Sequence, residues 1–156
     1  MTEGADGLDV IVSGLAARLR RLEDLLDIQQ LFVDYGRYLD AGDFRSYAAL
    51  FTGDGEILLG PMGRASGPQE IEALMTKALA DTVGDTYHLI TSPVIELDGD
   101  RATAEVMWTV VAREDHDQPR VTMIGRHVDE LVRERQRWRF RRRQGHISIP
   151  SRYGPS

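Results

Sequence analysis

RLEDLLDIQQLFVDYGRYLDAGD, residues 21–43, is the stretch that decides the fold of this chain. Plotted at 100° per residue, it gives a helix with many acidic residues on one side and mainly apolar residues on the other. The apolar side comprises Leu22, Leu25, Leu26, Gln29, Phe32, Val33, Gly36 and Leu39. The pattern predicts a long amphipathic helix that buries this side against the rest of the chain.

Asp40 falls within the apolar side of the predicted helix. It lies in the last turn, where the negative end of the helix dipole repels a carboxylate, so helix stability does not explain it. If its side chain points toward the interior, it is suited to proton transfer. Alternatively, the helix frays before Asp40, which is then a solvated residue of the turn at residues 41–43. The stretch alone leaves both interpretations open.

The composition indicates an ordinary globular domain. The chain has 156 residues, of which 42% are hydrophobic and 28% charged, a length that suits one domain with room for a pocket. It has no cysteine, which excludes disulfides, thiolate catalysis and zinc-thiolate sites. We find no helical His metal pair, no Gly-rich phosphate loop and no Gly-x-Ser-x-Gly elbow. These other chemistries therefore find little support in the sequence.

Charge and hydropathy also bear on partners and location. No apolar run approaches the roughly 20 residues that cross a bilayer, and the first seven residues do not resemble a secretory signal. The net charge of −6 disfavours nucleic acid and anionic membranes as partners. We expect a cytoplasmic protein with neither partner.

Helical patterns come first along the chain and strand patterns follow. We expect a disordered N-terminus at residues 1–7, one domain at residues 8–149 and a tail at residues 150–156. After the long helix we predict a short helix capped by Asp43, a short strand at 56–59 and a helix opening at Pro68. Long strands follow at 87–97, 101–113, 121–133 and 138–149. This order predicts an α+β fold in which a curved antiparallel sheet closes over the early helices.

His88 is the histidine best placed to meet Asp40. It lies at the start of the first long strand, just after a helix that must pack beside the main helix. If the sheet wraps the main helix, Asp40 and His88 face one cavity. A carboxylate there would fix the imidazole tautomer, and the ring would then move a proton near neutral pH. A single histidine on a strand can equally be structural or solvated.

Other residues are candidates for lining the same cavity. His127 shares the inward face of its strand with Met123, although Asp129 on that face complicates the assignment. Tyr35 lies about one turn before Asp40, and Trp108 offers an apolar wall, but each of these side chains can also simply fill the core. His146 shares its side with Trp138 and Phe140 unless Gly145 marks a bulge that resets the strand. His116 is expected in an exposed loop.

The basic run RERQRWRFRRRQ at residues 133–144 has two interpretations. Its interleaved aromatics are typical of a nucleic-acid surface. Its alternation, with Arg137, Arg139, Arg141 and Arg143 opposite Trp138 and Phe140, also fits a half-buried strand with a solvated outer face. We favour the strand.

Several segments carry a family resemblance. They are RLEDLLDIQQLFVDYGRYLDAGDFRSYAALFTGDGEI (21–57), GPQEIEAL (67–74), TYHLITSP (86–93) and GRHVDELVRERQRWRFRRRQ (125–144). Together they resemble a SnoaL-like member of the nuclear transport factor 2-like superfamily, over nearly the whole chain from residue 22 to 146. The resemblance implies a cone-shaped α+β barrel, a strongly curved and mainly antiparallel sheet around N-terminal helices, with a deep and mostly apolar pocket.

Within that superfamily, the chain is similar to the branch of scytalone dehydratase, bile acid 7α-dehydratase and hexachlorocyclohexane dehydrochlorinase. The resemblance implies a catalytic Asp40–His88 dyad without metal or organic cofactor, and it implies substrate contacts from Tyr35 and His127. Trp108, Met123 and His146 complete the expected substrate-binding set. The second hydroxyl donors of scytalone dehydratase are not evident here, which puts its particular reaction in question.

The resulting hypothesis is a cofactor-independent dehydratase-type lyase or isomerase. It would act by Asp-His general acid/base chemistry on a hydrophobic polycyclic or steroid-like small molecule. The alternative is a noncatalytic small-molecule-binding or dimeric assembly module of the same fold, because one fold serves many functions. Under either hypothesis, we expect the protein to form a homo-oligomer, a dimer or higher.

Overall fold

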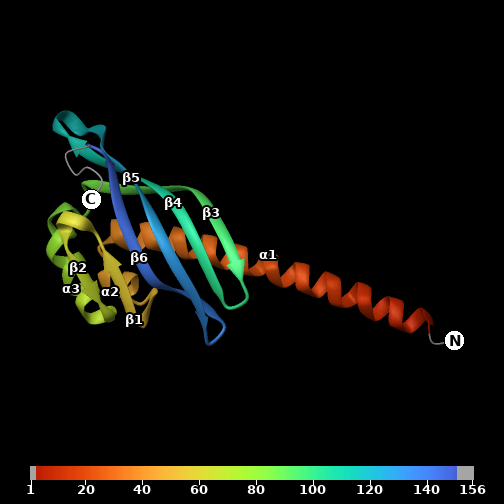
Figure 1. The fold of residues 1–156 in the computed structure, drawn as a ribbon. Coiled ribbons are helices and arrows are strands. Elements are labelled where there is room, and N and C mark those ends of the chain that lie inside the picture. Colours follow the sequence, from red (N-terminus) through yellow and green to blue (C-terminus); the bar gives the residue numbers. More distant parts are fainter. Residues whose placement is uncertain (1–2, 151–156) are drawn as a thin grey trace.

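The computed structural model describes residues 3–150 and has an α+β architecture (Figure 1). The first elements are α1 (Glu3–Ala41), α2 (Phe44–Ala48), β1 (Phe51–Leu58), β2 (Arg64–Ser66) and α3 (Gly67–Leu79). The long strands are β3 (Thr86–Asp98), β4 (Arg101–Glu114), β5 (Gln118–Glu134) and β6 (Arg137–Ile149). Short 3-10 turns occur at Gly60–Met62, Ala80–Thr82 and Asp115–Asp117. The helices precede the long strands, as predicted.

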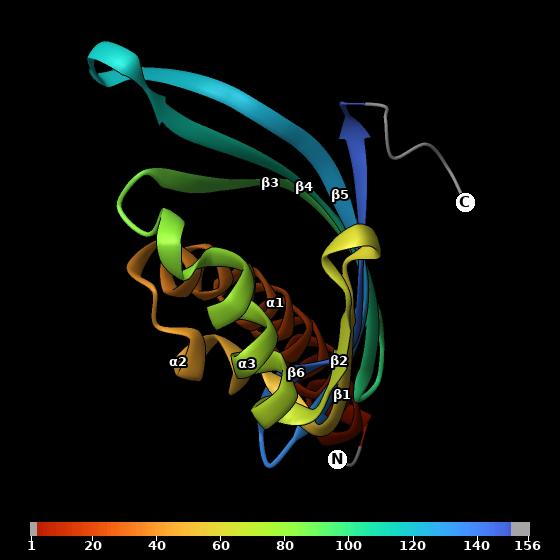
Figure 2. The same cartoon turned by 90° about the vertical axis from the view of Figure 1, so that its left-hand side faces the viewer.

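The strands form one mixed sheet in the order β2-β1-β6-β5-β4-β3. All neighbours are antiparallel except β1 and β6, which pair in parallel because the chain returns to β1 only after the helices and the meander. The sheet bends around α1, and α2 and α3 cover one end of its concave side (Figure 2). The predicted α+β fold with a strongly curved, mainly antiparallel sheet is confirmed.

Helix α1 is continuous from Glu3 to Ala41, where Gly42 ends it at φ 70°. Residues 3–7 are therefore helical, although the sequence suggested disorder there; residues 1–2 and 151–156 of the expected disordered N-terminus and tail lie outside the described residues. The N-terminal half projects beyond the sheet (Figure 1). Asp43 caps α2 as predicted, its carboxylate accepting the Ser46 amide over 3.0 Å.

The side of α1 that packs on the sheet overlaps the predicted side only in part. Its buried residues recur at helical spacing and are Asp24, Ile28, Leu31, Phe32, Tyr35, Gly36 and Leu39. Phe32, Gly36 and Leu39 belong to the predicted side. Leu22, Leu26 and Val33 of the predicted side are instead 58%, 64% and 50% exposed. The prediction merged two apolar stripes of α1, of which only one faces the core.

The core lies between this stripe and the concave face of the sheet. Aromatic rings dominate it: Phe32, Phe51 and Phe140 stack at centroid distances of 5.3–6.0 Å, and Tyr47 adjoins Phe51 at 5.6 Å. Tilted aromatic pairs of this kind add stability beyond their buried area. This aromatic layer packs α1 and α2 against β1 and β6.

A bulge in β6 changes the faces of the basic run. Glu130 pairs with Arg142 and Leu131 pairs with Phe140, which leaves Arg141 without an opposite residue in β5. The alternation therefore resets after Arg141, and Arg143 points inward and is fully buried. The prediction of a solvated Arg143 was wrong for this reason. Arg137 and Arg141 are exposed as expected.

Candidate active site

Asp40 and His88 are brought together by the packing of β3 against the end of α1. The helix does not fray before Asp40, since α1 continues to Ala41. Gly36, one turn earlier, lets the strand approach closely: a Cβ there would lie 3.3 Å from the His88 carbonyl oxygen and from a side-chain carbon of Ile90. A glycine in the helix thus sets how near the His88 backbone comes to Asp40.

The side chains of Asp40 and His88 are hydrogen-bonded at the distance of an ion pair. Nδ1 of His88 lies 2.8 Å from Oδ1 of Asp40, and the His88 backbone amide donates to the same oxygen over 2.9 Å. The side chains of His88 and Asp40 are 11% and 23% exposed. With Nδ1–H donated to the carboxylate, Nε2 is left as the basic nitrogen, and it has no protein partner within residues 3–150.

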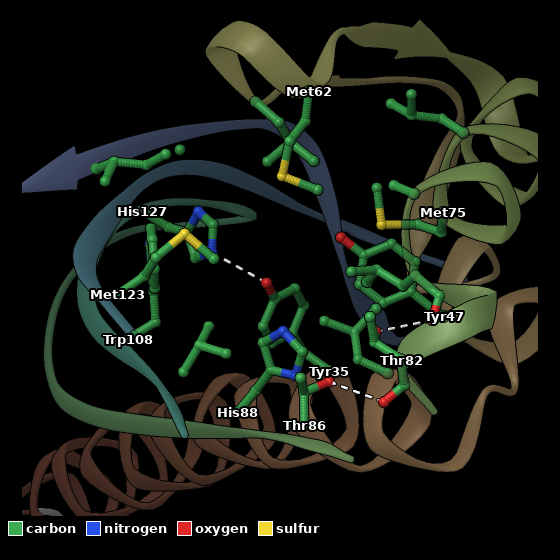
Figure 3. Close-up of a pocket in the computed structure, with 18 of the residues that line it drawn as sticks. Tyr35, Tyr47, Met62, Met75, Thr82, Thr86, His88, Trp108, Met123 and His127 are labelled. Carbon is green, nitrogen blue, oxygen red and sulfur yellow. Dashed lines mark hydrogen bonds between the residues drawn. The ribbon is translucent and has the colours of Figure 1, made fainter. Parts of the chain in front are cut away.

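His88 borders a cavity of about 550 Å³, a volume that suits a small molecule. Its walls come from α1, α2, α3, the turns at 59–62 and 80–82, and the inner faces of β3, β4, β5 and β6 (Figure 3). The lining is mainly apolar: Tyr35, Leu39, Tyr47, Leu59, Met62, Leu74, Met75, Ala78, Leu79, Trp108, Val110, Met123, Gly145 and Ile147, with Lys77, Thr82, Thr86, His88, Thr122 and His127 as the polar residues.

Tyr35 and His127 form a second polar pair in the wall. The Tyr35 hydroxyl and Nε2 of His127 are hydrogen-bonded over 3.0 Å (Figure 3). Burial raises the pKa of Tyr35 to about 12, so its phenol stays protonated. Burial, assisted by the positive charge of Arg143, holds the pKa of His127 well below its usual range, so the ring stays neutral. The pair can therefore act through hydrogen bonds rather than through charge.

A buried ion pair lies beneath these residues. Arg143 donates to both carboxylate oxygens of Asp129 over 2.7 and 2.6 Å, and neither side chain is exposed. The guanidinium also lies 4.2 Å from the ring centroid of Tyr35 and 4.0 Å from that of Phe140. Burial alone would lower the pKa of Arg143, but Asp129 outweighs it and raises that pKa. The pair thus stays charged and fixes the ring of Tyr35.

Neither the pairing of Asp129 nor the burial of Arg143 was predicted from the sequence. Desolvation raises the pKa of the Asp129 carboxyl, and Arg143 opposes that shift. Asp129 was noted on the inward face of its strand but had no evident partner. A carboxylate on an inward strand face is a signal that a buried cation must be near, and the bulge at Arg141 supplies it.

The remaining candidate residues divide between the cavity and the surface. Trp108 and Met123 line the cavity, as predicted. His146 does not: it pairs with Arg126 across β5 and β6 on the outer face, because the bulge moves Gly145 to the inside. His116 is exposed in the turn between β4 and β5. The polar hydroxyls of Thr86 and Thr122, not singled out from the sequence, also reach the lining.

Within residues 3–150, no group of three or more His, Asp or Glu side chains is arranged to hold a metal ion. In the same residues, no helix combines the length and hydropathy needed to span a bilayer.

The model of the SnoaL-like domain matches residues 20–144, from the middle of α1 to the end of the buried part of β6. This chain belongs to the SnoaL-like domain family. The resemblance drawn from the sequence segments is confirmed, and the match includes the positions of Asp40, His88 and His127. No curated protein matches the chain.

Solved structures share the fold over most of their length. An NTF2-like protein with a cystatin-like fold from Novosphingobium aromaticivorans is 27% identical, with 90% of this chain and 92% of that chain covered and a TM-score of 0.83. The putative scytalone dehydratase of the same bacterium is 21% identical over 83% of this chain and 87% of that one, with a TM-score of 0.72. A hexachlorocyclohexane dehydrochlorinase (LinA) is 20% identical over 85% and 90%, with a TM-score of 0.75. A mycobacterial protein of unknown function has a TM-score of 0.73 at 24% identity. At these identities the likeness is one of fold.

Proposed function

We propose that this SnoaL-like protein is a cofactor-independent lyase of the dehydratase type, or an isomerase, acting on a hydrophobic polycyclic or steroid-like molecule. The observation that carries the proposal is the 2.8 Å contact between Asp40 and Nδ1 of His88 at the wall of the apolar cavity. That contact turns Nε2 of His88 into a base that can reach a guest.

The chemistry follows from where each group lies. Nε2 of His88 takes a proton from a carbon next to an electron-withdrawing carbonyl, and the electrons of the C–H bond move to give an enolate. Asp40 stabilises the resulting imidazolium. In a dehydration the enolate expels a β-hydroxyl, which leaves as water with the proton returned by His88. In an isomerisation His88 returns the proton to a different carbon, and the double bond migrates.

Tyr35 and His127 are the groups we assign to the oxygen of the substrate. Both line the cavity, and each is a neutral hydrogen-bonding group because burial keeps the phenol protonated and the imidazole uncharged. A neutral donor in a dry site stabilises a developing enolate oxygen without becoming an acid itself. Arg143 positions Tyr35 from behind and does not border the cavity.

The substrate class follows from the walls. Methionine, leucine and aromatic side chains surround most of the space, and methionines adapt to irregular apolar shapes. About 550 Å³ accommodates several fused rings rather than a short metabolite. Two structural neighbours have names that state an activity, a putative scytalone dehydratase and a hexachlorocyclohexane dehydrochlorinase, and both activities are eliminations.

The rival is a noncatalytic binding module of the same fold. It would be favoured by a separated Asp40 and His88 or by a cone filled with side chains. The observed contact and the open cavity favour the enzyme instead.

The test is a panel of polycyclic ketones that carry either a hydroxyl or halide β to the carbonyl or a β,γ double bond. Mass spectrometry follows elimination, and the ultraviolet absorbance of the conjugated enone follows double-bond migration. We expect elimination or double-bond migration by the wild type and a loss of at least about 100-fold in Asp40→Asn, since a general base contributes that much or more. Binding, followed by quenching of tryptophan fluorescence at Trp108, should persist in the variant. The matched control is Asp27→Asn, the same change on the exposed side of α1.

Normal turnover by Asp40→Asn would contradict the dyad. Tight binding of panel members without turnover of any of them would support the binding module.

A further inference from the structure

The N-terminal half of α1 carries a stripe of apolar side chains into solvent. We call this stripe the seam, defined as Leu8, Val12, Leu15, Leu19, Leu22 and Leu26. All are between 55% and 64% exposed. The part of the helix that bears most of the seam projects past the sheet, so no other element of the described chain covers it (Figure 1). Exposed leucines at regular spacing on one helix face mark an interaction surface.

The spacing of the seam is that of a coiled coil. Its residues alternate at intervals of four and three, which is the heptad repeat. By the same helical geometry, the seam lies on the side of α1 opposite the buried stripe of Ile28, Leu31 and Tyr35. One helix thus has two apolar faces, one for its own sheet and one for another helix.

The projecting segment of α1 would not be stable in water as an isolated helix. Gly7 and Gly14 lie within it, and each costs about 1 kcal/mol relative to alanine. Val10, Ile11 and Val12 are β-branched and add a further cost. Most helical stability in proteins comes from packing of an apolar face, so the projection requires a partner for the seam.

We propose that the seam pairs with the seam of a second copy of this chain in a parallel, in-register coiled coil. Leucine at the d positions 8, 15 and 22, with valine at the first a position, suits two strands. From Leu8 to Leu26 the seam runs about 27 Å at 1.5 Å per residue. A second copy is the partner that this seam matches residue for residue.

Charges beside the seam favour the parallel arrangement. Arg18 and Glu23 flank it at g and e positions, so a parallel pair brings Arg18 of one copy against Glu23 of the other, twice by symmetry. Neither residue forms an ion pair within residues 3–150. An antiparallel pair would bring Arg18 against Arg18 and Asp9 against Glu23, which are like charges. The flanking charges therefore select the parallel pair.

This interface leaves the candidate active site untouched. The cavity is bordered by the C-terminal end of α1, and the seam lies on its N-terminal half. Pairing through the seam therefore does not depend on the proposed reaction.

The first experiment compares sedimentation of the full chain with that of two paired variants. Val12→Asp with Leu19→Asp puts charges into the seam and should weaken the dimer by more than about 100-fold, because buried unpaired carboxylates are costly. The control, Val10→Asp with Ala17→Asp, adds the same charges at the same spacing on the opposite side of the same exposed segment. It should leave the dimer intact. Circular dichroism checks that the sheet domain folds in each variant.

The second experiment fixes the direction of the pair. Because the chain has no cysteine, Leu8→Cys creates a single thiol. A parallel pair brings the two thiols together, so mild oxidation gives a covalent dimer, whereas an antiparallel pair separates them by about 27 Å. Arg18→Glu should weaken the dimer, and adding Glu23→Arg should restore it.

A monomeric wild type, or a dimer that survives the seam variant, would overturn the proposal. A dimer that the control variant disrupts equally would overturn it as well. Failure of Leu8→Cys to cross-link within an intact dimer would overturn the parallel arrangement.

Discussion

Two buried charged residues, Arg143 and Asp129, support the wall of the cavity. Arg143 and Asp129 remain charged because each satisfies the other, and the guanidinium face supports the rings of Tyr35 and Phe140. Such a pair adds little net stability, but removal of one partner leaves an uncompensated buried charge. Here the Arg143–Asp129 pair holds the ring of Tyr35 in place.

We therefore expect Asp129→Asn to destabilise the fold by about 3–5 kcal/mol, because Arg143 is left buried without its counter-charge. Urea unfolding followed by circular dichroism measures the loss. The control is Asp85→Asn, which breaks an exposed contact of 3.2 Å with Arg113 and should change stability little. Equal stabilities of the two variants would refute the charged pair.

His127 should make the fold sensitive to mild acid. Burial, followed by the Arg143 charge, depresses its pKa in the folded state, while the unfolded ring keeps a pKa near 6.5. As the pH falls below about 6.5, the His127 ring binds a proton in the unfolded state but stays neutral in the folded state. Stability then declines by at most about 1.4 kcal/mol per pH unit, until the folded pKa is reached.

Urea unfolding at pH 7.0, 6.0 and 5.5 tests this sign. His127→Gln should flatten the decline, and His116→Gln, in the exposed turn, should leave it unchanged. A free energy of unfolding that changes by the same amount between pH 7.0 and 5.5 in all three proteins would contradict a buried neutral His127.

Among the elements, β5 is shaped by a glycine that makes room for its neighbours. A Cβ on Gly125 would lie 2.2 Å from the His146 carbonyl oxygen and 2.3 Å from the indole of Trp108. Trp108 lies opposite Gly125 in the β4–β5 ladder, so the glycine lets its indole lie flat against the sheet as a cavity wall. No other residue type fits without moving the strand or the indole.

Gly125→Ala should therefore cost about 1–3 kcal/mol and weaken binding of an apolar guest, because the strain must be relieved by shifting β6 or Trp108. Thermal unfolding and fluorescence titration measure the two effects. Gly53→Ala in β1, where a Cβ would meet nothing within 4 Å, is the matched control. Unchanged stability and binding in Gly125→Ala would show that the wall is not packed as described.

Most elements were predictable from local pattern, and the exceptions have physical causes. The long strands begin and end within three residues of the predicted bounds, because alternation and turn residues act locally. The buried side of α1 was not predictable, because Leu22 and Leu26 belong to one apolar stripe and Phe32 and Leu39 to another. Choosing between two stripes requires knowing which one the sheet meets.

The site was predictable in part for a similar reason. Asp40 and His88 stood out through chemistry and through family resemblance, and their contact depends on the passage of β3 beside Gly36. Arg143 was placed on the wrong face because the bulge at Arg141 leaves no signal in the alternation itself. His146 went to the outer face through the same shift.

At the scale of the whole molecule, the two proposed roles lie at opposite ends of one helix. The C-terminal half of α1 forms the wall of the cavity, and its N-terminal half presents the seam (Figure 1). The curved sheet, which bends over α1 (Figure 2), and α3 supply most of the other lining residues of the cavity. The central claim is that His88, oriented by Asp40, is a base facing this cavity.

Deuterium exchange tests that claim without requiring the natural leaving group. Polycyclic ketones are incubated with the protein in heavy water, and mass spectrometry counts deuterium gained next to the carbonyl. The wild type should deuterate at least one bound ketone well above buffer, and His88→Gln should fall to the buffer rate while still binding it. Wild-type exchange by His88→Gln, or no exchange in any ketone that the wild type binds, would contradict it.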